Sequence, residues 1–267
     1  MSYGSMDELI RDLETNPIEA SGSVYHPIPF PEFAYLTTSS NAERVHEKLK
    51  LIRQTLRSIY PESLIGKTIL DIGANGGFYA FSLAQDGAEV TAIEPHPRYA
   101  AVGEFLAREK KDLNVKWISE SLQLEHLAGR QYDVALLLSV FQWMCEGNNK
   151  LEAGKHLLGE ISRHVDVLFF ELGVNSGKSS ITTRKINHLA YIYHLLKAST
   201  EYKDVKLVGV TRIWEPSRDK CSFLKRIARP VVRIIRRRHY CRYLFVCSRS
   251  PLDIREPWFS FLKYAGV

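Results

Sequence analysis

Residues 68–78 read TILDIGANGGF and decide the fold. An apolar run of strand length ends at Ile72 and leads directly into a turn rich in glycine. Beyond this turn, short apolar runs alternate with amphipathic stretches along most of the chain. Strands that alternate with helices need crossover connections, which produce a mostly parallel sheet covered on both faces. We therefore expect an α/β protein with a mostly parallel sheet.

The same pattern predicts the individual elements. Apolar runs place seven strands at residues 68–72, 89–93, 114–118, 132–139, 166–172, 205–214 and 240–247. Amphipathic spacing predicts helices at 6–14, 40–60, 77–86, 97–110, 150–163 and 182–199. Residues 23–38 hold three prolines and should be irregular. Only a basic stretch separates the last two strands, which favours an antiparallel final strand.

Composition excludes several classes of protein. Of the 267 residues, 45% are hydrophobic and 25% charged, as in a globular protein and unlike a disordered chain, a collagen or a coiled coil. The longest apolar runs fall far short of the roughly 20 residues that cross a bilayer. The first residues carry acids where a signal peptide is apolar. The four cysteines show no CxxC spacing, so we expect a cytoplasmic protein without a disulfide framework or a metal site.

The residue before the glycine turn indicates the charge of the ligand. In a doubly wound sheet, ligands bind at the carboxyl ends of the strands, beside such turns. A nucleotide-phosphate loop reads GxGxxG or GxxxxGKS/T, and residues 73–78 match neither pattern. Asp71 stands just before the first glycine, where a carboxylate would repel a pyrophosphate but suits ammonium and sulfonium charges. The sequence therefore points to S-adenosylmethionine rather than to NAD or ATP.

Further polar residues stand at the ends of the following strands. Glu94 ends the second strand, where a carboxylate can accept hydrogen bonds from both ribose hydroxyls. The pair Glu120 and Ser121 follows the third strand, where the adenine edge would lie. The residues predicted in this way to bind the methyl donor are Asp71, Gly73, Asn75, Gly77, Glu94, Pro95, Glu120, Ser121 and Ser139.

Three motifs in this order resemble the class I S-adenosylmethionine-dependent methyltransferases. LDIGANGG looks like their glycine motif, AIEP like their acidic strand end, and YDVALLLSVFQW like their fourth strand. The resemblance implies a Rossmann-like seven-stranded sheet and S-adenosylmethionine as cofactor. It covers residues 60–175, and the seven-strand plan extends it to about residue 248.

A narrower resemblance concerns SVFQWMCEGNN, the later LFFELGV and the leader YHPIPFPEF. These stretches are similar to the methyltransferase part of bacterial O-antigen chain-terminating methyltransferase–kinases. The resemblance implies that Tyr25, with Lys48 or Arg44, holds the carboxylate of the cofactor. Two departures are expected to matter: those relatives carry a histidine pair where this chain has Gln142 and Trp143, and we expect no kinase domain within these 267 residues.

The chemistry of transfer indicates where the acceptor binds. Methyl transfer is an in-line displacement, so the enzyme must hold the nucleophile, methyl carbon and sulfur in line. A sugar hydroxyl also needs a base, whereas an ionised oxygen needs cations to bind it. We place the acceptor over the end of the fourth strand and predict catalytic roles for Glu171 and Gln142. Trp143 is expected to be a packing residue rather than a wall of this site.

Basic residues concentrate in one part of the chain. Residues 217–249 hold eleven Lys and Arg residues and one acid, Asp219. Within them, 224–237 reads as an amphipathic element that is interrupted by Pro230. It would dock on an anionic membrane surface or an anionic acceptor. A solvated insertion is the alternative, and RNA is a competing partner.

We therefore expect an S-adenosylmethionine-dependent methyltransferase that acts on an oxygen of a glycan, a phospho-glycan or another anionic small molecule. The alternatives are an RNA methyltransferase and a non-catalytic binding subunit of the same fold. The chain is divided into an N-terminal lid with helices (1–60), the methyltransferase domain (61–250, with a basic insertion at 217–239) and a C-terminal tail (251–267). We expect it in the cytoplasm, at the inner face of the membrane if the basic element docks there.

Overall fold

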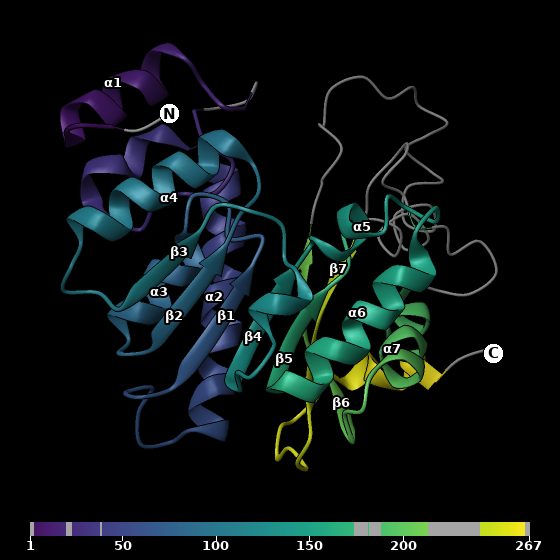
Figure 1. The fold of residues 1–267 in the computed structure, drawn as a ribbon. Helices are drawn as coiled ribbons and strands as arrows, with labels where there is room; N and C mark the ends of the chain where they lie inside the picture. The colour runs from purple at the N-terminus through teal and green to yellow at the C-terminus, as the bar shows by residue number, and fades with distance from the viewer. Residues whose placement is uncertain are drawn as a thin grey trace, which may run out of the picture.

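The fold is a seven-stranded sheet with the strand order β3-β2-β1-β4-β5-β7-β6 (Figure 1). The computed structural model describes residues 3–19, 23–37, 39–173, 181, 188–212 and 241–264. β1 to β5 run parallel, and β7 runs antiparallel to both β5 and β6. The strands are β1 Thr68–Ile72, β2 Glu89–Ile93, β3 Val115–Ile118, β4 Tyr132–Leu138, β5 Val165–Glu171, β6 Asp204–Arg212 and β7 Cys241–Ser248. The predicted fold class and the antiparallel final strand are confirmed.

Helices cover both faces of the sheet, because each packs an apolar stripe into one of three hydrophobic clusters. α2 (Ser39–Ile59) and α3 (Phe78–Gln85) pack on the face that carries Ile69, Val134 and Phe169. α6 (Leu151–His164) and α7 (His188–Ser199) pack on the opposite face, together with the single turn α5 (Phe141–Met144). Figure 1 shows α2 behind the sheet and α6 in front of it. The carboxyl ends of β1 to β5 therefore meet at one edge, between these two layers.

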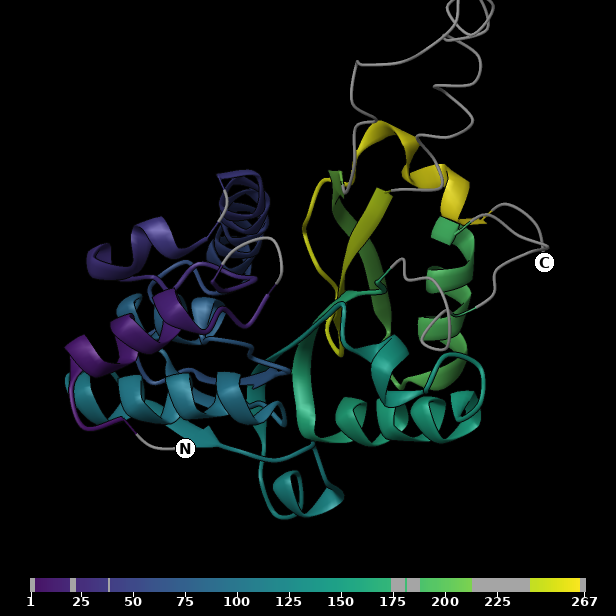
Figure 2. The same cartoon turned by 90° about the horizontal axis from the view of Figure 1, so that it is seen from above.

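The N-terminal segment lies on α4 (Pro97–Glu109), as Figure 2 shows from above. It consists of α1 (Met6–Thr15) and the 3₁₀ helix η1 (Pro31–Leu36), which falls within the stretch predicted to be irregular. Two ion pairs fasten it to α4 and the residue after it: Asp12 contacts Arg98 at 2.8 Å, and Glu32 contacts Lys110 at 3.0 Å. Tyr99 Oη accepts a hydrogen bond from Tyr25 N at 3.1 Å. The leader is thus held beside the carboxyl edge of the sheet.

The C-terminal 3₁₀ helix η4 (Trp258–Tyr264) packs against α7. Phe259 and Leu262 reach the core, and the buried Lys263 pairs with Glu256 at 2.6 Å. A short 3₁₀ turn, η2 (Leu124–His126), lies between β3 and β4.

Some expectations fall outside the described residues. These are the basic insertion at 217–239 with its amphipathic element at 224–237, and residues 182–187 at the start of a predicted helix. Within the described ranges, no helix combines the length and the apolar character needed to cross a membrane.

Candidate active site

The glycine turn after β1 has a backbone that only glycine fits well. Gly73 and Gly77 have φ values of 73° and 88°, a region that other residues rarely adopt. A Cβ on Gly73 would lie 2.4 Å from Val140, and one on Gly77 would lie 2.5 Å from Phe81. The amides of Gly73 and Ala74 both donate to the carbonyl of Ile93, at 2.8 and 3.0 Å. The turn is therefore fixed to the end of β2, and α3 begins directly behind it.

Two side chains at this turn keep polar atoms that the described residues do not satisfy. Asp71 is buried at 3% exposure, and its Oδ2 has no hydrogen-bond partner among them. The same holds for Oδ1 of Asn75. Burial, with the neighbouring Glu94 carboxylate, raises the pKa of Asp71 to about 7. A cation beside Asp71 would favour its ionised form, so this carboxylate fits a positively charged ligand.

Glu94 is held at the end of β2 by the backbone. Its Oε2 accepts from Asn75 N and its Oε1 from His96 N, both at 2.8 Å. Burial still raises the pKa of Glu94 above its usual value, although both amides counteract this. Each carboxylate oxygen keeps further acceptor capacity. Glu94 can therefore take hydroxyl donors of a ribose in the position that the backbone gives it.

The remaining predicted donor residues are more exposed. Glu120 and Ser121 follow β3 and face solvent, and Glu120 Oε1 lies 2.9 Å from His126 Nε2. Pro95 is also exposed, next to Glu94. The structure thus brings Asp71, Gly73, Asn75, Gly77 and Glu94 together at the ends of β1 and β2, with Glu120 and Ser121 at the end of the neighbouring strand.

Ser139, at the end of β4, has an unusual backbone conformation. Its φ is 59°, which is costly for a residue with a side chain unless the surroundings impose it. Its amide donates to the Glu171 carbonyl at 2.7 Å, and its carbonyl accepts from Gln142 Nε2 at 2.6 Å. Its hydroxyl donates to Glu171 Oε1 and accepts from Arg242 Nη1 at 3.1 Å. Four hydrogen bonds therefore hold Ser139 in this conformation.

Glu171 is the centre of a buried ion cluster at the end of β5. Its Oε1 accepts from Lys48 Nζ at 2.7 Å and lies 3.8 Å from Arg242 Nη1, and its Oε2 accepts from Thr211 Oγ1 at 3.1 Å. Burial alone would raise the pKa of Glu171, but Lys48 and Arg242 outweigh it and hold the pKa below the usual value. One carboxylate faces two cations, so the cluster of Lys48, Glu171 and Arg242 carries a surplus positive charge.

Gln142 and Trp143 differ in what they contact. The side-chain amide of Gln142 is buried. Its Nε2 donates a hydrogen bond to the Ser139 carbonyl, and its Oε1 accepts one from Gly173 N at 3.0 Å. Gln142 thus links the ends of β4 and β5, and its predicted catalytic role stays a prediction. Trp143 is 62% exposed, so the expectation that it packs in the interior is wrong. The single turn α5 directs Phe141 and Gln142 inward and leaves Trp143 outside.

Sequence reasoning missed three residues of this edge: His26, Tyr79 and Arg242. The ring of His26 stacks on Tyr25, with centroids 4.9 Å apart, and meets the edge of Tyr79 at 5.8 Å. Burial, then Lys48 and Arg242, lower the pKa of His26 to about 3. The sequence did contain one signal of a buried ion cluster. Lys48 falls within the apolar stripe of Val45, Leu49 and Ile52, and a buried charge there needs a partner of opposite charge. In the structure Lys48 forms an ion pair with Glu171, whereas the resemblance implied a contact between Lys48 and the cofactor.

Comparisons with known proteins agree with this geometry. Residues 70–166 match the family described as "Methyltransferase domain". Ubiquinone biosynthesis O-methyltransferase of Serratia proteamaculans is 30% identical over 96 residues, which cover 36% of this chain and 39% of that protein. The enzyme of the same name from Salmonella paratyphi A is 28% identical over 118 residues, which cover 43% of this chain and 46% of that protein. The chain thus spans less than half the length of these relatives.

Solved structures share the fold over almost the whole chain. A crystal structure of WbdD, described elsewhere as a bifunctional kinase-methyltransferase, has a TM-score of 0.62 at 19% identity. The match covers 92% of this chain and 48% of WbdD. The N-terminal domain of EvdMO1, solved with SAH bound, has a TM-score of 0.56 at 13% identity, with 94% and 98% covered. The match to a methyltransferase domain indicates S-adenosylmethionine as the cofactor, and the glycine turn, Asp71 and Glu94 fit it. Residues 70–166 thus match a methyltransferase domain, and the chain is similar to the class I S-adenosylmethionine-dependent methyltransferases, the family that its strand-end motifs resemble.

Proposed function

We propose that this protein transfers the methyl group of S-adenosylmethionine to an oxygen atom of an anionic acceptor. This acceptor is a glycan, a phospho-glycan or another anionic small molecule. The bound cofactor supplies an electrophilic methyl group on a sulfonium. The observation that carries the choice of acceptor is the buried cluster of Lys48, Glu171 and Arg242, with its surplus positive charge. The names of the curated relatives, which are O-methyltransferases, support oxygen as the nucleophile.

The donor half of the site is built from the ends of β1 and β2. Asp71 provides a buried carboxylate with an oxygen that the described residues leave unpaired, next to the cationic part of the ligand. Glu94 accepts the ribose hydroxyls, and the glycine turn lets the backbone approach closely. A dry, preformed site of this kind fixes the direction of attack.

In the part of the chain that the structure describes, the acceptor half offers cations but no suitable base. A general base works best when its pKa lies near the operating pH. Glu171 has a lowered pKa, and both its oxygens already accept hydrogen bonds. His26, with a pKa of about 3, is too weak a base to take a proton from a sugar hydroxyl. These groups favour an acceptor oxygen that arrives already ionised, as in a phosphate or a carboxylate.

The alternatives make different predictions. An RNA methyltransferase would use the basic insertion, and its affinity for RNA would fall steeply with salt. A non-catalytic subunit would not need a donor site, so the retained Asp71, glycine turn and Glu94 argue against it. We also propose the division into a lid (1–60), a methyltransferase domain (61–250) and a tail (251–267), and a cytoplasmic location with the basic insertion at an anionic surface.

The proposal is tested by transfer of a labelled methyl group to separate acceptor fractions. Phospho-glycans, neutral glycans, anionic small metabolites and RNA should be compared at equal concentration, with donor binding measured by calorimetry. We expect the label in the anionic glycan or metabolite fraction and none in neutral glycans. Label in RNA alone would replace the proposed acceptor, and failure to bind S-adenosylmethionine would favour the non-catalytic subunit.

A further inference from the structure

Several buried polar atoms at the carboxyl edge of the sheet have no hydrogen-bond partner among the described residues. Asp71 Oδ2 and Asn75 Oδ1 belong to the donor half described above. Tyr79 Oη and Arg242 Nε are also buried and find no hydrogen-bond partner in the described part of the chain, and neither has a role in that half. An unsatisfied buried donor costs free energy that a ligand can recover. A ligand that accepts hydrogen bonds from Tyr79 Oη and Arg242 Nε would therefore be stabilised at this edge.

The Tyr79 hydroxyl is subject to charges from both halves of the site, Asp71 in the donor half and Glu171 in the acceptor half. It is the second residue of α3, directly after the glycine turn, and its side chain is almost completely buried. Its ring is fixed by edge contacts with His26 at 5.8 Å and Phe78 at 5.1 Å. Burial, then the charges of Glu171 and Asp71, raise the pKa of Tyr79 well above its usual value. The hydroxyl thus stays protonated and can donate a hydrogen bond.

Within the described residues, Arg242 contacts the cluster through Nη1. Nη1 donates to Ser139 Oγ at 3.1 Å and lies 3.8 Å from Glu171, whereas Nε is unpartnered. Glu171 already pairs with Lys48, so it does not neutralise Arg242 fully. The charge of Arg242 also acts on the Tyr79 hydroxyl. Arg242 and Tyr79 therefore offer two buried donors and a positive charge at the same edge of the sheet.

We propose that Tyr79 and Arg242 form the acceptor-recognising pair: Tyr79 Oη–H and Arg242 Nε–H donate hydrogen bonds to the oxyanion that receives the methyl group. This inference rests on the proposed function and deepens it, because it assigns the residues that select the acceptor. In the transfer, a lone pair of the oxyanion forms the new C–O bond while the C–S bond breaks and its electrons stay on sulfur. The oxygen is already ionised, so no proton has to leave. Ser139 and Glu171 are positioning residues that hold Arg242.

A competing role for Tyr79 lies on the donor side. The hydroxyl also feels the charge of Asp71, so it would then bind the methyl donor rather than the acceptor. The two roles separate experimentally, because S-adenosylhomocysteine probes the donor half and inorganic phosphate or acetate probes the acceptor half. The matched control is Tyr202, a second buried tyrosine whose hydroxyl is unpartnered and whose pKa is raised well above the usual value. It precedes β6 and lies at the opposite edge of the sheet.

The test is calorimetric titration of wild type, Tyr79→Phe, Arg242→Lys, Arg242→Gln and Tyr202→Phe. Each protein is first titrated with S-adenosylhomocysteine and then, when saturated, with phosphate and with acetate. A hydrogen bond to a charged group contributes about tenfold in affinity. We expect phosphate or acetate binding to weaken about tenfold in Tyr79→Phe and further in Arg242→Gln, whereas S-adenosylhomocysteine binding changes less than about twofold. Tyr202→Phe should match wild type.

Several results would overturn the inference. Weakened S-adenosylhomocysteine binding in Tyr79→Phe, with anion binding unchanged, would move Tyr79 to the donor half. Wild type that binds S-adenosylhomocysteine but neither anion would remove the acceptor pair while leaving the donor site intact. Wild type that does not bind S-adenosylhomocysteine would refute the proposed function itself. Arg242→Lys keeps the positive charge beside Glu171 and is therefore the variant of Arg242 that should fold normally. A variant is compared with wild type only if its unfolding midpoint is unchanged.

Discussion

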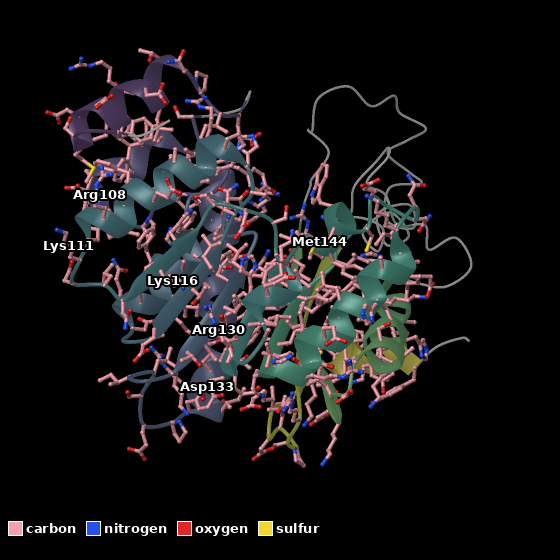
Figure 3. The ribbon with its side chains drawn as sticks, viewed as in Figure 1. Arg108, Lys111, Lys116, Arg130, Asp133 and Met144 are labelled. Atoms are coloured by element: carbon pink, nitrogen blue, oxygen red, sulfur yellow. The ribbon has the colours of Figure 1, made fainter. Side chains whose placement is uncertain are left out.

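The two edges of the sheet each hold an aspartate, and the two aspartates differ in how well the surrounding residues satisfy their carboxylate oxygens. At the amino edge, Asp133 accepts hydrogen bonds from Thr68 N and Lys67 Nζ, both at 2.9 Å, and from Thr68 Oγ1 at 3.0 Å. At the carboxyl edge, Asp71 is more deeply buried and has an oxygen with no partner in the described structure. Figure 3 shows Asp133 at the lower end of the sheet and Met144, on α5, at the upper end.

The difference separates a structural edge from a functional one. Burial alone would raise the pKa of Asp133, but the hydrogen bonds of Thr68 and Lys67 hold it below the usual value. Burial and Glu94 raise the pKa of Asp71. An unsatisfied buried group costs about 1–3 kcal/mol, so the carboxyl edge is less stable than it could be. We infer that this cost is retained because a ligand completes the edge.

The largest effect is expected when the ion cluster at the carboxyl edge is broken. Glu171→Gln leaves Lys48 and Arg242 without their buried counter-ion. Loss of one partner of a buried pair typically costs about 3–5 kcal/mol, so the free energy of unfolding in urea should fall by this amount. The combined variant Lys48→Met with Glu171→Leu should recover part of the loss. Unchanged stability in Glu171→Gln would contradict the cluster.

Asp71→Asn should abolish most donor binding without harming the fold. Removing a buried charge that faces a cationic ligand costs a few kcal/mol of binding, or about 100-fold in affinity for S-adenosylmethionine. The folded protein disfavours ionised Asp71, so the neutral variant should unfold at the same or a higher temperature at pH 8. Calorimetry and thermal unfolding measure the two quantities. Donor affinity close to that of wild type would refute the assigned role.

Asp133→Asn is the matched change at the amino edge. It removes the charge that pairs with Lys67 at 2.9 Å and disturbs the hydrogen bonds from Thr68. We expect a loss of about 1–3 kcal/mol in the free energy of unfolding and an unchanged affinity for S-adenosylmethionine. A loss of donor affinity at constant stability would abolish the contrast between the two edges.

The pH dependence of donor binding sharpens the same contrast. Asp71 without ligand has a pKa of about 7 and must lose its proton to face a cation. The affinity for S-adenosylmethionine should therefore fall by up to about tenfold per pH unit below pH 7, down to about pH 5, and change little from Asp71 above it. Asp71→Asn should remove this slope, and a slope that persists in the variant would assign it to another group.

The donor half was predictable because its parts are local in sequence. Asp71, Gly73 and Gly77 stand within one turn, and Glu94 ends the adjacent strand, so strand pattern and glycine spacing sufficed. The acceptor half was predictable only in part. Glu171 was named from the sequence, but its partners are distant in the chain: Arg242 reaches it because β7 lies beside β5, and Lys48 because α2 packs on the sheet. Tyr79 reads as a core aromatic of a helix, and only the structure reveals its unpartnered hydroxyl. Trp143 was misjudged because the single turn α5 buries Phe141 and Gln142 and leaves Trp143 exposed.

The most direct test of the central claim is a crystal structure of this chain with S-adenosylhomocysteine. The account predicts the ligand at the ends of β1 and β2, with its ribose hydroxyls on Glu94 and its amino acid part near Asp71. Ligand density at another edge of the sheet, or a carboxyl edge that stays empty at saturating ligand, would contradict it.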